Sequence, residues 1–303
     1  MPLRQRHQRH CNLQGTFSRK HRDRGHERGL ERFPRVSLCA MSREAWEQVR
    51  SWSREPGTAA VLTDIDGVLA PIVPTPDMSE VSEELRELLR SLGERYRVVA
   101  GISGRSAVDA LRLVGLEELV YYGNHGFEVL RPGGQVETIP EAAPYKEKVE
   151  ELERRAREEL GPLGASVEEK GITASIHYRN ASPEVGERCK AFVKSEGERL
   201  GLRITIGRGV VEARPPIRAD KGTATRKVVE EYEPLKALFI GDDTTDLDAF
   251  RELEKLREEG VLAEALRIGV KSEEGPPEIV SEADLVVDIE GVGVVLSTLA
   301  GQG

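Results

Sequence analysis

The sequence predicts an α/β fold in which a parallel sheet is wound with helices and interrupted by an α+β insertion. Short apolar runs recur along the 303 residues, amphipathic helical patterns separate these runs, and the texture changes between positions 128 and 213. Apolar runs of this length are typical of strands that are buried on both faces of a parallel sheet. A chain of this length also favours two domains over one.

The first part of the predicted core alternates strands with helices. Residues 59–62 are an apolar run that we expect to be a strand, and residues 96–102, which contain the apolar run 98–100, are expected to be the second strand. Between them, Asp-Met-Ser-Glu at 77–80 resembles a capping box at the start of a helix, and apolar residues recur after it at helical spacing. Ser106 and Asp109 have the spacing that caps the next helix. This alternation predicts right-handed parallel winding.

Residues 128–213 are expected to form the inserted cap. After a Pro-Gly-Gly turn, its predicted elements are a charged helix at about 143–160, a strand at 171–179, a helix capped by Ser182, and strands near 202–206 and 210–213. The alternation then resumes with a helix after Lys221 and with strands that end at 241, 270 and 289. We therefore predict a Rossmann-like core formed by residues 42–127 and 214–303.

The first 41 residues are expected to be a disordered basic tail. Residues 1–40 hold ten Lys or Arg, three Asp or Glu and four of the six histidines, without an apolar run that could bury a core. Met41, followed by Ser-Arg-Glu-Ala-Trp, is typical of a natural start. We therefore interpret the preceding stretch as a misassigned extension, with a tail that contacts nucleic acid or a membrane as the alternative.

Charge and cysteine content limit the partners. The whole chain carries −9 and the first 40 residues carry +7, so residues 41–303 carry −16. An acidic body argues against nucleic acid as a partner. The sequence contains no run of about 20 apolar residues, which is the length that a membrane-spanning helix needs. Three cysteines without C-x-x-C spacing fit a reducing cytoplasm, and Cys189 lies at the helical spacing of a core position. The oligomeric state stays open, with a monomer as the expectation.

Two carboxylates follow the first predicted strand. Asp64 and Asp66 are two residues apart, and Gly67 lets the chain turn directly after them. Two carboxylates near one point suit a division of labour, in which one is an ionised nucleophile and the other a proton donor. A plain turn is the alternative for this tetrapeptide taken alone.

Three further polar clusters follow other predicted strands or open a helix. Ser103 ends the second strand, where its hydroxyl and the nearby N–H groups could bind phosphoryl oxygens, although such serines are usually turn formers or caps. Lys221 lies in the first turn of a helix, where the helix dipole disfavours a cation unless an anion is bound. Asp242, Asp243 and Asp246 crowd negative charge that a divalent cation would relieve; a solvated acidic loop is the alternative. Because the carboxyl ends of parallel strands converge, we expect one site.

The combination of motifs resembles the haloacid dehalogenase-like (HAD) phosphatase superfamily. Its order is Asp-x-Asp-Gly after a strand, Ser after a strand, Lys opening a helix and Gly-Asp-Asp after a strand, and it covers the chain from about Thr58. A finer resemblance is to trehalose-6-phosphate phosphatases. It rests on seven segments, at 66–72, 102–105, 123–128, 168–171, 177–179, 212–215 and 241–250. Asn124 departs from this pattern, because Ser is common there.

The resemblance implies a mechanism and a set of site residues. It implies an Mg²⁺-dependent phosphomonoester hydrolase that acts on trehalose 6-phosphate, a small-molecule substrate, through an aspartyl phosphate, with a cap that sets specificity. The residues implied for catalysis are Asp64, Asp66, Ser103 and Lys221, and those implied for the metal are Asp64, Asp66 and Asp242. Those implied to orient them are Asp243, Asp246 and Arg105. Those implied for substrate binding are Gly104, Arg105, His125, Lys170, His177, Arg179 and Glu212.

Two alternatives to this function stay open. A phosphatase for another sugar phosphate, such as sucrose 6-phosphate or mannosyl-3-phosphoglycerate, would share the core and a similar cap. A non-catalytic sugar-phosphate-binding protein would tolerate loss of the nucleophile, whereas all five core residues are present here: Asp64, Asp66, Ser103, Lys221 and Asp242.

Overall fold

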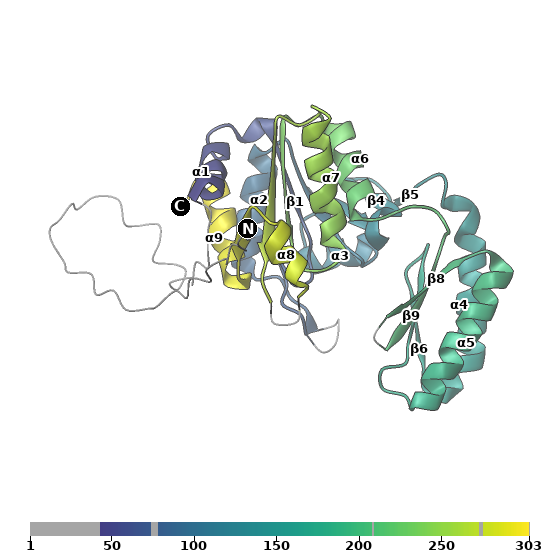
Figure 1. Cartoon of the computed structure of the whole chain (residues 1–303). Helices are drawn as coiled ribbons and strands as arrows, with labels where there is room; N and C mark the ends of the chain where they lie inside the picture. Colours follow the sequence, from purple (N-terminus) through teal and green to yellow (C-terminus); the bar gives the residue numbers. More distant parts are fainter. Residues whose placement is uncertain (1–42, 74–77, 208, 273–274, 303) are drawn as a thin grey trace, which may run out of the picture. The chain divides into compact units, whose positions relative to one another are not determined.

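A computed structural model describes residues 43–73, 78–207, 209–272 and 275–302. The predicted tail, the proposed start at Met41, and Cys11 and Cys39 lie outside these residues. Among the described residues, the larger of two sheets has eight strands in the order β12-β11-β10-β1-β2-β3-β4-β5 (Figure 1). Their bounds are β1 Ala59–Thr63, β2 Val98–Ile102, β3 Val120–Gly123, β4 Glu128–Leu130, β5 Glu137–Thr138, β10 Lys236–Gly241, β11 Glu264–Val270 and β12 Leu285–Val287.

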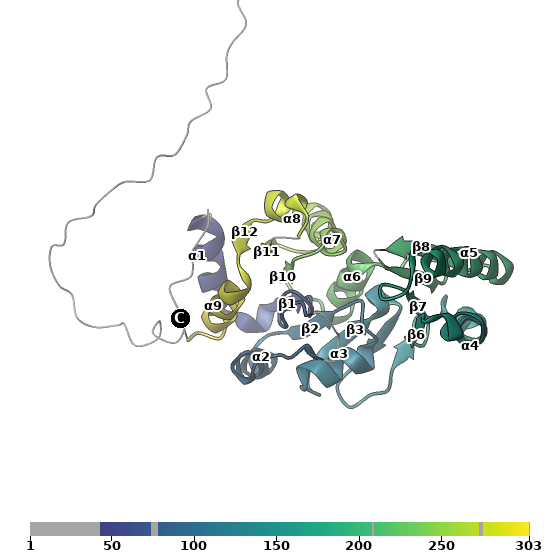
Figure 2. The same ribbon diagram turned by 90° about the horizontal axis from the view of Figure 1, so that it is seen from below.

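The strands from β12 to β3 are parallel to their neighbours, as the apolar runs predicted. Helices cover both faces of this parallel part (Figure 2). On one face the helices are α1 Arg43–Trp52, α2 Glu83–Arg95, α3 Ala107–Val114 and α9 Ile289–Leu299. On the other face they are α6 Lys221–Tyr232, α7 Asp246–Glu258 and α8 Pro277–Glu282. The α/β fold class predicted from the sequence is therefore confirmed.

Local capping signals account for several element boundaries. The Ser106 hydroxyl accepts a hydrogen bond from the Asp109 N–H and begins α3, as predicted. The predicted start of α2 is wrong: its N-cap is Ser82 rather than a residue of the 77–80 box, of which Asp77 lies outside the described residues. The last strand stops at Val287 instead of 289, because the Asp288 carboxylate accepts from Gly291 N–H and begins α9.

The second sheet has the order β6-β7-β9-β8 and is antiparallel. Its strands are β6 Ser166–Glu169, β7 Ala174–His177, β8 Arg203–Gly207 and β9 Val210–Arg214, and its helices are α4 Lys146–Leu160 and α5 Pro183–Leu200. Apolar side chains of the sheet and of both helices form one buried cluster that includes Cys189, so its predicted core position is confirmed. The other face of the sheet carries a polar row, in which Ser175 pairs with Glu168 and Glu212, and Glu212 pairs with Thr205.

The insertion predicted to begin at Glu128 starts with a hairpin that belongs to the large sheet. β4 pairs antiparallel with β3, and β5 pairs antiparallel with β4. The turn between them fits Gly133, whose φ is +67°, and the Gly134 N–H donates to the Arg131 carbonyl. Only after this hairpin do the described residues build the second sheet. The domain boundaries otherwise stay predictions.

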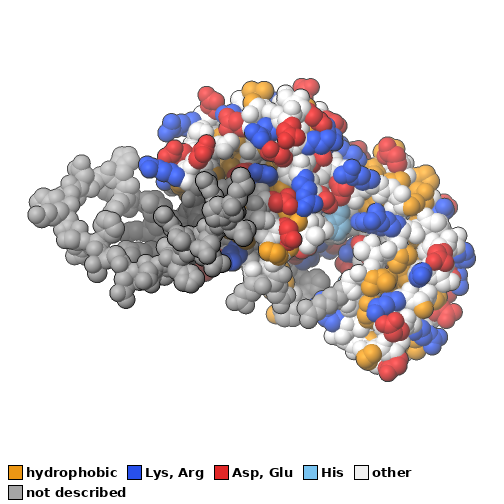
Figure 3. All heavy atoms as spheres, in the orientation of Figure 1, with side chains coloured by type: hydrophobic (Ala, Val, Ile, Leu, Met, Phe, Trp, Pro, Cys, Tyr) orange, Lys and Arg blue, Asp and Glu red, His pale blue; other side chains and the backbone are white. Residues whose placement is uncertain are grey.

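Charged side chains of both signs are interspersed over the face drawn in Figure 3. No helix of the described residues combines the length and the apolar character that a membrane crossing requires.

Candidate active site

The sequence-predicted core residues meet in one cavity of about 520 Å³. It lies where the loops after β1, β2, β3 and β10 converge with the start of α6, at the carboxyl ends of the parallel strands. The lining residues that the sequence predicted are Asp64, Asp66, Ser103, Gly104, Arg105, His125, Lys170, Lys221, Asp242 and Asp243. Residues that it did not predict also line the cavity: Ile72, Glu168, Thr245, Ser272 and Gly275.

Asp64 is held by the end of β1. Its N–H donates to the Ile240 carbonyl of β10 at 2.8 Å, which continues the strand pairing one residue beyond β1. Its Oδ1 accepts from the Ile65 N–H at 2.7 Å, and its Oδ2 lies 2.7 Å from Lys221 Nζ. A backbone N–H thus holds one oxygen of the Asp64 side chain, and the buried ammonium of Lys221 holds the other.

Gly67 allows the turn after Asp64 to approach the β10 loop. Its φ is +81°, and a Cβ atom there would lie 2.0 Å from Asp242 Oδ2. Any side chain at this position would therefore displace the Asp242 carboxylate as well as strain the backbone.

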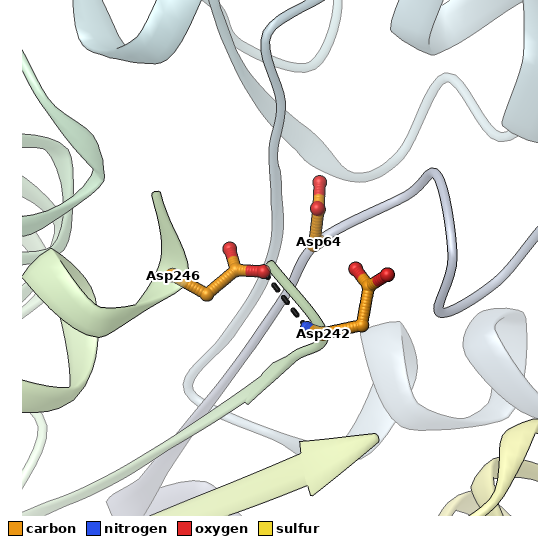
Figure 4. A group of neighbouring side chains, drawn as sticks. All are labelled: Asp64, Asp242 and Asp246. Atoms are coloured by element: carbon orange, nitrogen blue, oxygen red, sulfur yellow. Dashed lines mark hydrogen bonds between the residues drawn. The ribbon is translucent and has the colours of Figure 1, made fainter. Parts of the chain in front are cut away.

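Asp246 ties Lys221 to the β10 loop. Its Oδ1 accepts from Lys221 Nζ at 2.6 Å, and its Oδ2 accepts from the N–H groups of Asp242 and Asp243, each at 2.9 Å. Figure 4 shows the Asp246 carboxylate beside the Asp242 backbone, with the Asp64 side chain close by. Both oxygens of this fully buried carboxylate are used within the protein. Asp246 thus contacts Lys221 and the backbone of Asp242 and Asp243, and the orienting role implied for it stays a prediction.

Burial sets the charge state of this cluster. Burial raises the pKa of Asp64 well above its usual value, and the attraction of Lys221 opposes that effect. Burial and the charge of Asp246 raise the pKa of Asp242 to about 7. Burial alone would lower the pKa of Lys221, but Asp246 and Asp64 outweigh it and raise the pKa. Ionised, the three carboxylates and one ammonium sum to a negative charge, which a cation would neutralise.

The same carboxylates have the arrangement of a metal site. Asp64, Asp242 and Asp246 each offer an oxygen, and these oxygens lie within 4.8 Å of one another. Asp242 Oδ1 is buried and has no hydrogen-bond partner among the described residues. Carboxylate oxygens are the ligands that Mg²⁺ prefers, so the residues present fit this ion.

Asp66 is held by Arg105 across the cavity. Arg105 Nε donates to Asp66 Oδ2 at 2.7 Å and Nη2 donates to Oδ1 at 2.6 Å, a bidentate pair. The hydrogen bonding of Arg105 to the Asp66 carboxylate is the main cause that raises the pKa of Arg105. Arg105 thus lines the cavity and contacts Asp66, and the two roles implied for it stay predictions.

The loop after β2 places Ser103 and Gly104 against His125. Ser103 is buried, and its Oγ accepts from the Arg105 N–H at 3.1 Å. A Cβ atom on Gly104 would lie 2.7 Å from the His125 ring, so glycine lets the two loops touch. Burial, together with the charges of Lys221 and Lys170, lowers the pKa of His125 to about 3. The imidazole is therefore neutral.

Two charged residues of the hairpin that β6 and β7 form, Glu168 and Lys170, line the cavity. Lys170 lines it, and its Nζ lies 3.6 Å from Glu168 Oε2. His177 Nε2 is 2.8 Å from the same carboxylate oxygen, and this hydrogen bond is the main cause that lowers the pKa of Glu168. We did not single out Glu168 from the sequence. The available signal was that Glu168 and Lys170 are two residues apart, because side chains at this spacing lie on the same face of a strand. This signal was weak, since β6 ends at Glu169 and Lys170 lies just beyond it.

The remaining predicted sugar-binding residues do not line this cavity. His177 hydrogen-bonds to Glu168, which lines the cavity. Glu212 lies in the polar row of the second sheet, two strands from Glu168. Arg179 lines a separate hollow beside the start of α5, together with Tyr178 and Lys190. The roles implied for these residues stay predictions.

Comparison with known proteins places this site in a family. A model of the family described as Trehalose-phosphatase matches residues 62–280, and so includes every predicted site residue. The trehalose-phosphate phosphatase of Mycobacterium marinum is 38% identical over 197 residues, which cover 63% of this chain and 50% of that protein. That of Mycobacterium tuberculosis is 36% identical over 204 residues, which cover 65% and 51%. The matched part thus spans about half the length of these curated relatives.

Solved structures share the fold. A trehalose-6-phosphate phosphatase related protein has a TM-score of 0.66 at 22% identity and covers 80% of this chain and 97% of its own. The C-terminal domain of a Candida albicans trehalose-6-phosphate phosphatase has a TM-score of 0.63 at 21% identity, with 88% and 99% covered. At these identities the likeness concerns the fold alone.

Proposed function

The chain belongs to the trehalose-phosphatase family, and from this premise we propose that it hydrolyses trehalose 6-phosphate to trehalose and phosphate. The observation that carries the proposal is the Asp64 carboxylate, which lies against the Lys221 ammonium in a cavity that also receives residues of the second sheet. Such a site can bind a phosphate at its floor and a sugar at its mouth. The proposed setting is a cytoplasmic monomer.

In the first step Asp64 attacks phosphorus. A bond forms between the carboxylate oxygen and phosphorus, and the bond from phosphorus to the sugar oxygen breaks. Asp66, which takes up a proton once its pair with Arg105 opens, gives that proton to the sugar oxygen. An attacking carboxylate must be ionised. Lys221, at 2.7 Å from Oδ2, favours the ionised form against the effect of burial.

In the second step water hydrolyses the aspartyl phosphate. Asp66 takes a proton from the water as it attacks phosphorus, and the bond to Asp64 breaks. Lys221 and Ser103 would hold phosphoryl oxygens in both steps, since both line the cavity. Because Arg105 holds both oxygens of Asp66, the ion pair must open when substrate enters, and Arg105 is then available to the phosphate.

Mg²⁺ would be held by the carboxylates of Asp64 and Asp242 and by the Asp66 carbonyl. The unpartnered Asp242 Oδ1 supports this assignment, as does the complete use of both Asp246 oxygens by Lys221 and by backbone. The ion supplies positive charge that screens the repulsion between an anionic nucleophile and an anionic substrate.

Removal of divalent ions is expected to abolish turnover, and Mg²⁺ is expected to restore it. Mg²⁺ should also raise the thermal unfolding midpoint of the wild type, because an ion that binds only the folded state stabilises it. Calorimetry with EDTA and with added Mg²⁺ measures this shift. Asp242→Asn is expected to lose the shift; an equal shift in this variant would contradict the ligand assignment.

The sugar would meet the polar row of the second sheet. Glu168 and Lys170 line the cavity, and Glu212 lies in the same row as Glu168. A neutral disaccharide offers hydroxyl groups, which can donate hydrogen bonds to carboxylates and accept them from ammonium groups. Selectivity among phosphate esters would therefore come from this sheet, and closure of the cap would exclude water.

Glu212→Ala is expected to lower kcat/KM for trehalose 6-phosphate by roughly 10- to 100-fold, while hardly changing hydrolysis of p-nitrophenyl phosphate. The reason is that the lost acceptor serves only a ligand that reaches the cap. Glu169→Ala is the matched control, because Glu169 is the register partner of Ala174 and so lies on the opposite face of the same sheet. Equal losses on both substrates would assign Glu212 to the fold or to the core site.

Phosphate release from a panel of sugar phosphates tests the substrate itself. Trehalose 6-phosphate is expected to be preferred over glucose 6-phosphate, sucrose 6-phosphate and mannosyl-3-phosphoglycerate. Equal efficiency on any of them would overturn the named substrate and keep the phosphatase, whereas binding without release would favour a sugar-phosphate-binding protein.

A further inference from the structure

We propose that Asn124 is a positioning residue that fixes the hairpin carrying Lys170 to the loop carrying Ser103 and Arg105. It thereby favours esters that reach the cap over small phosphate esters. The inference rests on the proposed sugar-phosphatase activity for its substrate, and on Asn124 itself for its physical cause.

The backbone of Asn124 belongs to the phosphate side of the cavity. Its N–H donates to the Arg105 carbonyl at 2.7 Å, and the next N–H, of His125, donates to the Ser103 carbonyl at 2.9 Å. Its φ is +51°, a left-handed conformation that asparagine tolerates better than most residues. The loop after β3 is therefore locked onto the loop after β2.

The side chain of Asn124 binds the other side. Its Nδ2 donates to the Lys170 carbonyl at 2.7 Å, and its Oδ1 accepts from the Thr173 hydroxyl at 2.9 Å. Burial raises the pKa of the Glu128 carboxylate, and the Ala107 N–H, which donates to it at 2.6 Å, and the Asn124 amide oppose this effect. Because the Lys170 carbonyl can only accept, the amide orientation is determined by chemistry.

The segment that Asn124 holds is a tight turn. The Lys170 N–H donates to the Thr173 carbonyl at 3.2 Å, and the Ile172 N–H donates to the Lys170 carbonyl at 3.0 Å. The Lys170 carbonyl therefore receives two donors, one from its own turn and one from Asn124. Since the Lys170 side chain lines the cavity, a shift of this carbonyl would move its ammonium relative to the phosphate site.

The reach of the side chain and its separate donor and acceptor atoms explain why an amide fits here better than a hydroxyl. Asn124 is only 1% exposed, so its groups must find partners inside the protein. An amide has an N–H donor and an acceptor oxygen on separate atoms, and the Lys170 carbonyl and the Thr173 hydroxyl use one of each. A serine hydroxyl has a shorter reach and would have to face both partners with a single oxygen. The asparagine at position 124, where Ser is common in the family pattern, therefore has a physical role.

Two substitutions separate the side chain from the backbone. Asn124→Asp keeps the shape and tolerates the left-handed conformation, but it sets a carboxylate against the Lys170 carbonyl and the Glu128 carboxylate. Asn124→Gly keeps the conformation and removes the side chain. Glu233→Gly is the matched control, since Glu233 also has a left-handed φ, of +47°, and does not line the cavity.

Kinetics test the consequence for the substrate. We expect both Asn124 variants to lose about 10-fold in kcat/KM for trehalose 6-phosphate and to stay within about twofold for p-nitrophenyl phosphate. Added to Lys170→Met, Asn124→Gly should cause little further loss, because the two residues act through one contact. Parallel losses on both esters, or independent effects that multiply, would overturn the positioning role.

Hydrogen exchange tests the contact without any substrate. In Asn124→Gly, the amides of residues 170–173 should exchange about 10-fold or more faster than in the wild type, while those of β1 are unchanged. Unchanged exchange at 170–173 would overturn the inference. If the wild type fails to prefer trehalose 6-phosphate, the proposed substrate falls, and the exchange result still decides whether Asn124 holds the turn.

Discussion

Asp64→Asn is expected to lower phosphatase turnover by about three orders of magnitude or more, with the fold retained. The substitution keeps size and hydrogen bonding but removes the charge that must attack phosphorus and bind the metal. Folding should persist because Lys221 keeps Asp246 as a partner at 2.6 Å, and an amide oxygen can still accept from the Ile65 N–H. Turnover of the purified variant and its thermal unfolding midpoint measure the two effects.

Asp243→Asn is a suitable comparison for the nucleophile, since Asp243 lines the same cavity but has no contact with Lys221 among those found for the described residues. We expect a much smaller loss there. If Asp64→Asn kept more than about a tenth of wild-type turnover, the covalent route through this carboxylate would be wrong.

Lys221→Met is expected to abolish activity and also to destabilise the fold, by about 3–5 kcal/mol. Lys221 is buried between Asp64 and Asp246, and it is the counter-charge of a cluster that also contains Asp242. Removing one partner of a buried ion pair leaves the others as uncompensated buried charges. Chemical denaturation in EDTA, so that no ion replaces the ammonium, measures the loss.

The loss of folding stability in Lys221→Met, relative to the wild type, should become smaller as the pH falls. Burial already raises the pKa of Asp242 from 3.8 to about 7, and the pKa of Asp64 is raised as well. An acidic group whose pKa is higher in the folded state than in the unfolded state makes the folded protein more stable as the pH falls from the folded pKa toward the unfolded one. The wild type keeps its ammonium across this range, because the raised pKa of Lys221 lies above it. A deficit that is independent of pH between about 7 and 4 would mean that packing, not charge, causes it.

The activity of Asp64→Asn and the stability of Lys221→Met report different things. The first tests chemistry at one atom while the ion pair with Asp246 survives, and the second removes the charge on which both carboxylates depend. A Lys221→Met variant that is stable but inactive would confine the residue to phosphate binding.

The sequence by itself determined the alternation of strands and helices in the core and the core residues of the site, although not the whole lining of the cavity. Each motif adjoins its own apolar run, as Asp64 adjoins β1 and Asp242 adjoins β10, and the carboxyl ends of parallel strands converge. Local signals also predicted caps such as Ser106 and the buried position of Cys189. These features depend on residues that are close in the chain, so periodicity and spacing suffice to predict them.

Tertiary structure decided which polar groups became partners. The bidentate pair of Arg105 with Asp66, the use of both Asp246 oxygens, and the contact of Asn124 with Lys170 join residues from separate elements. It also placed β4 and β5 in the large sheet. Such pairings depend on the distance and direction between side chains after the chain has packed, and a buried polar group takes whichever partner the packing brings near. No local pattern in the sequence encodes that choice.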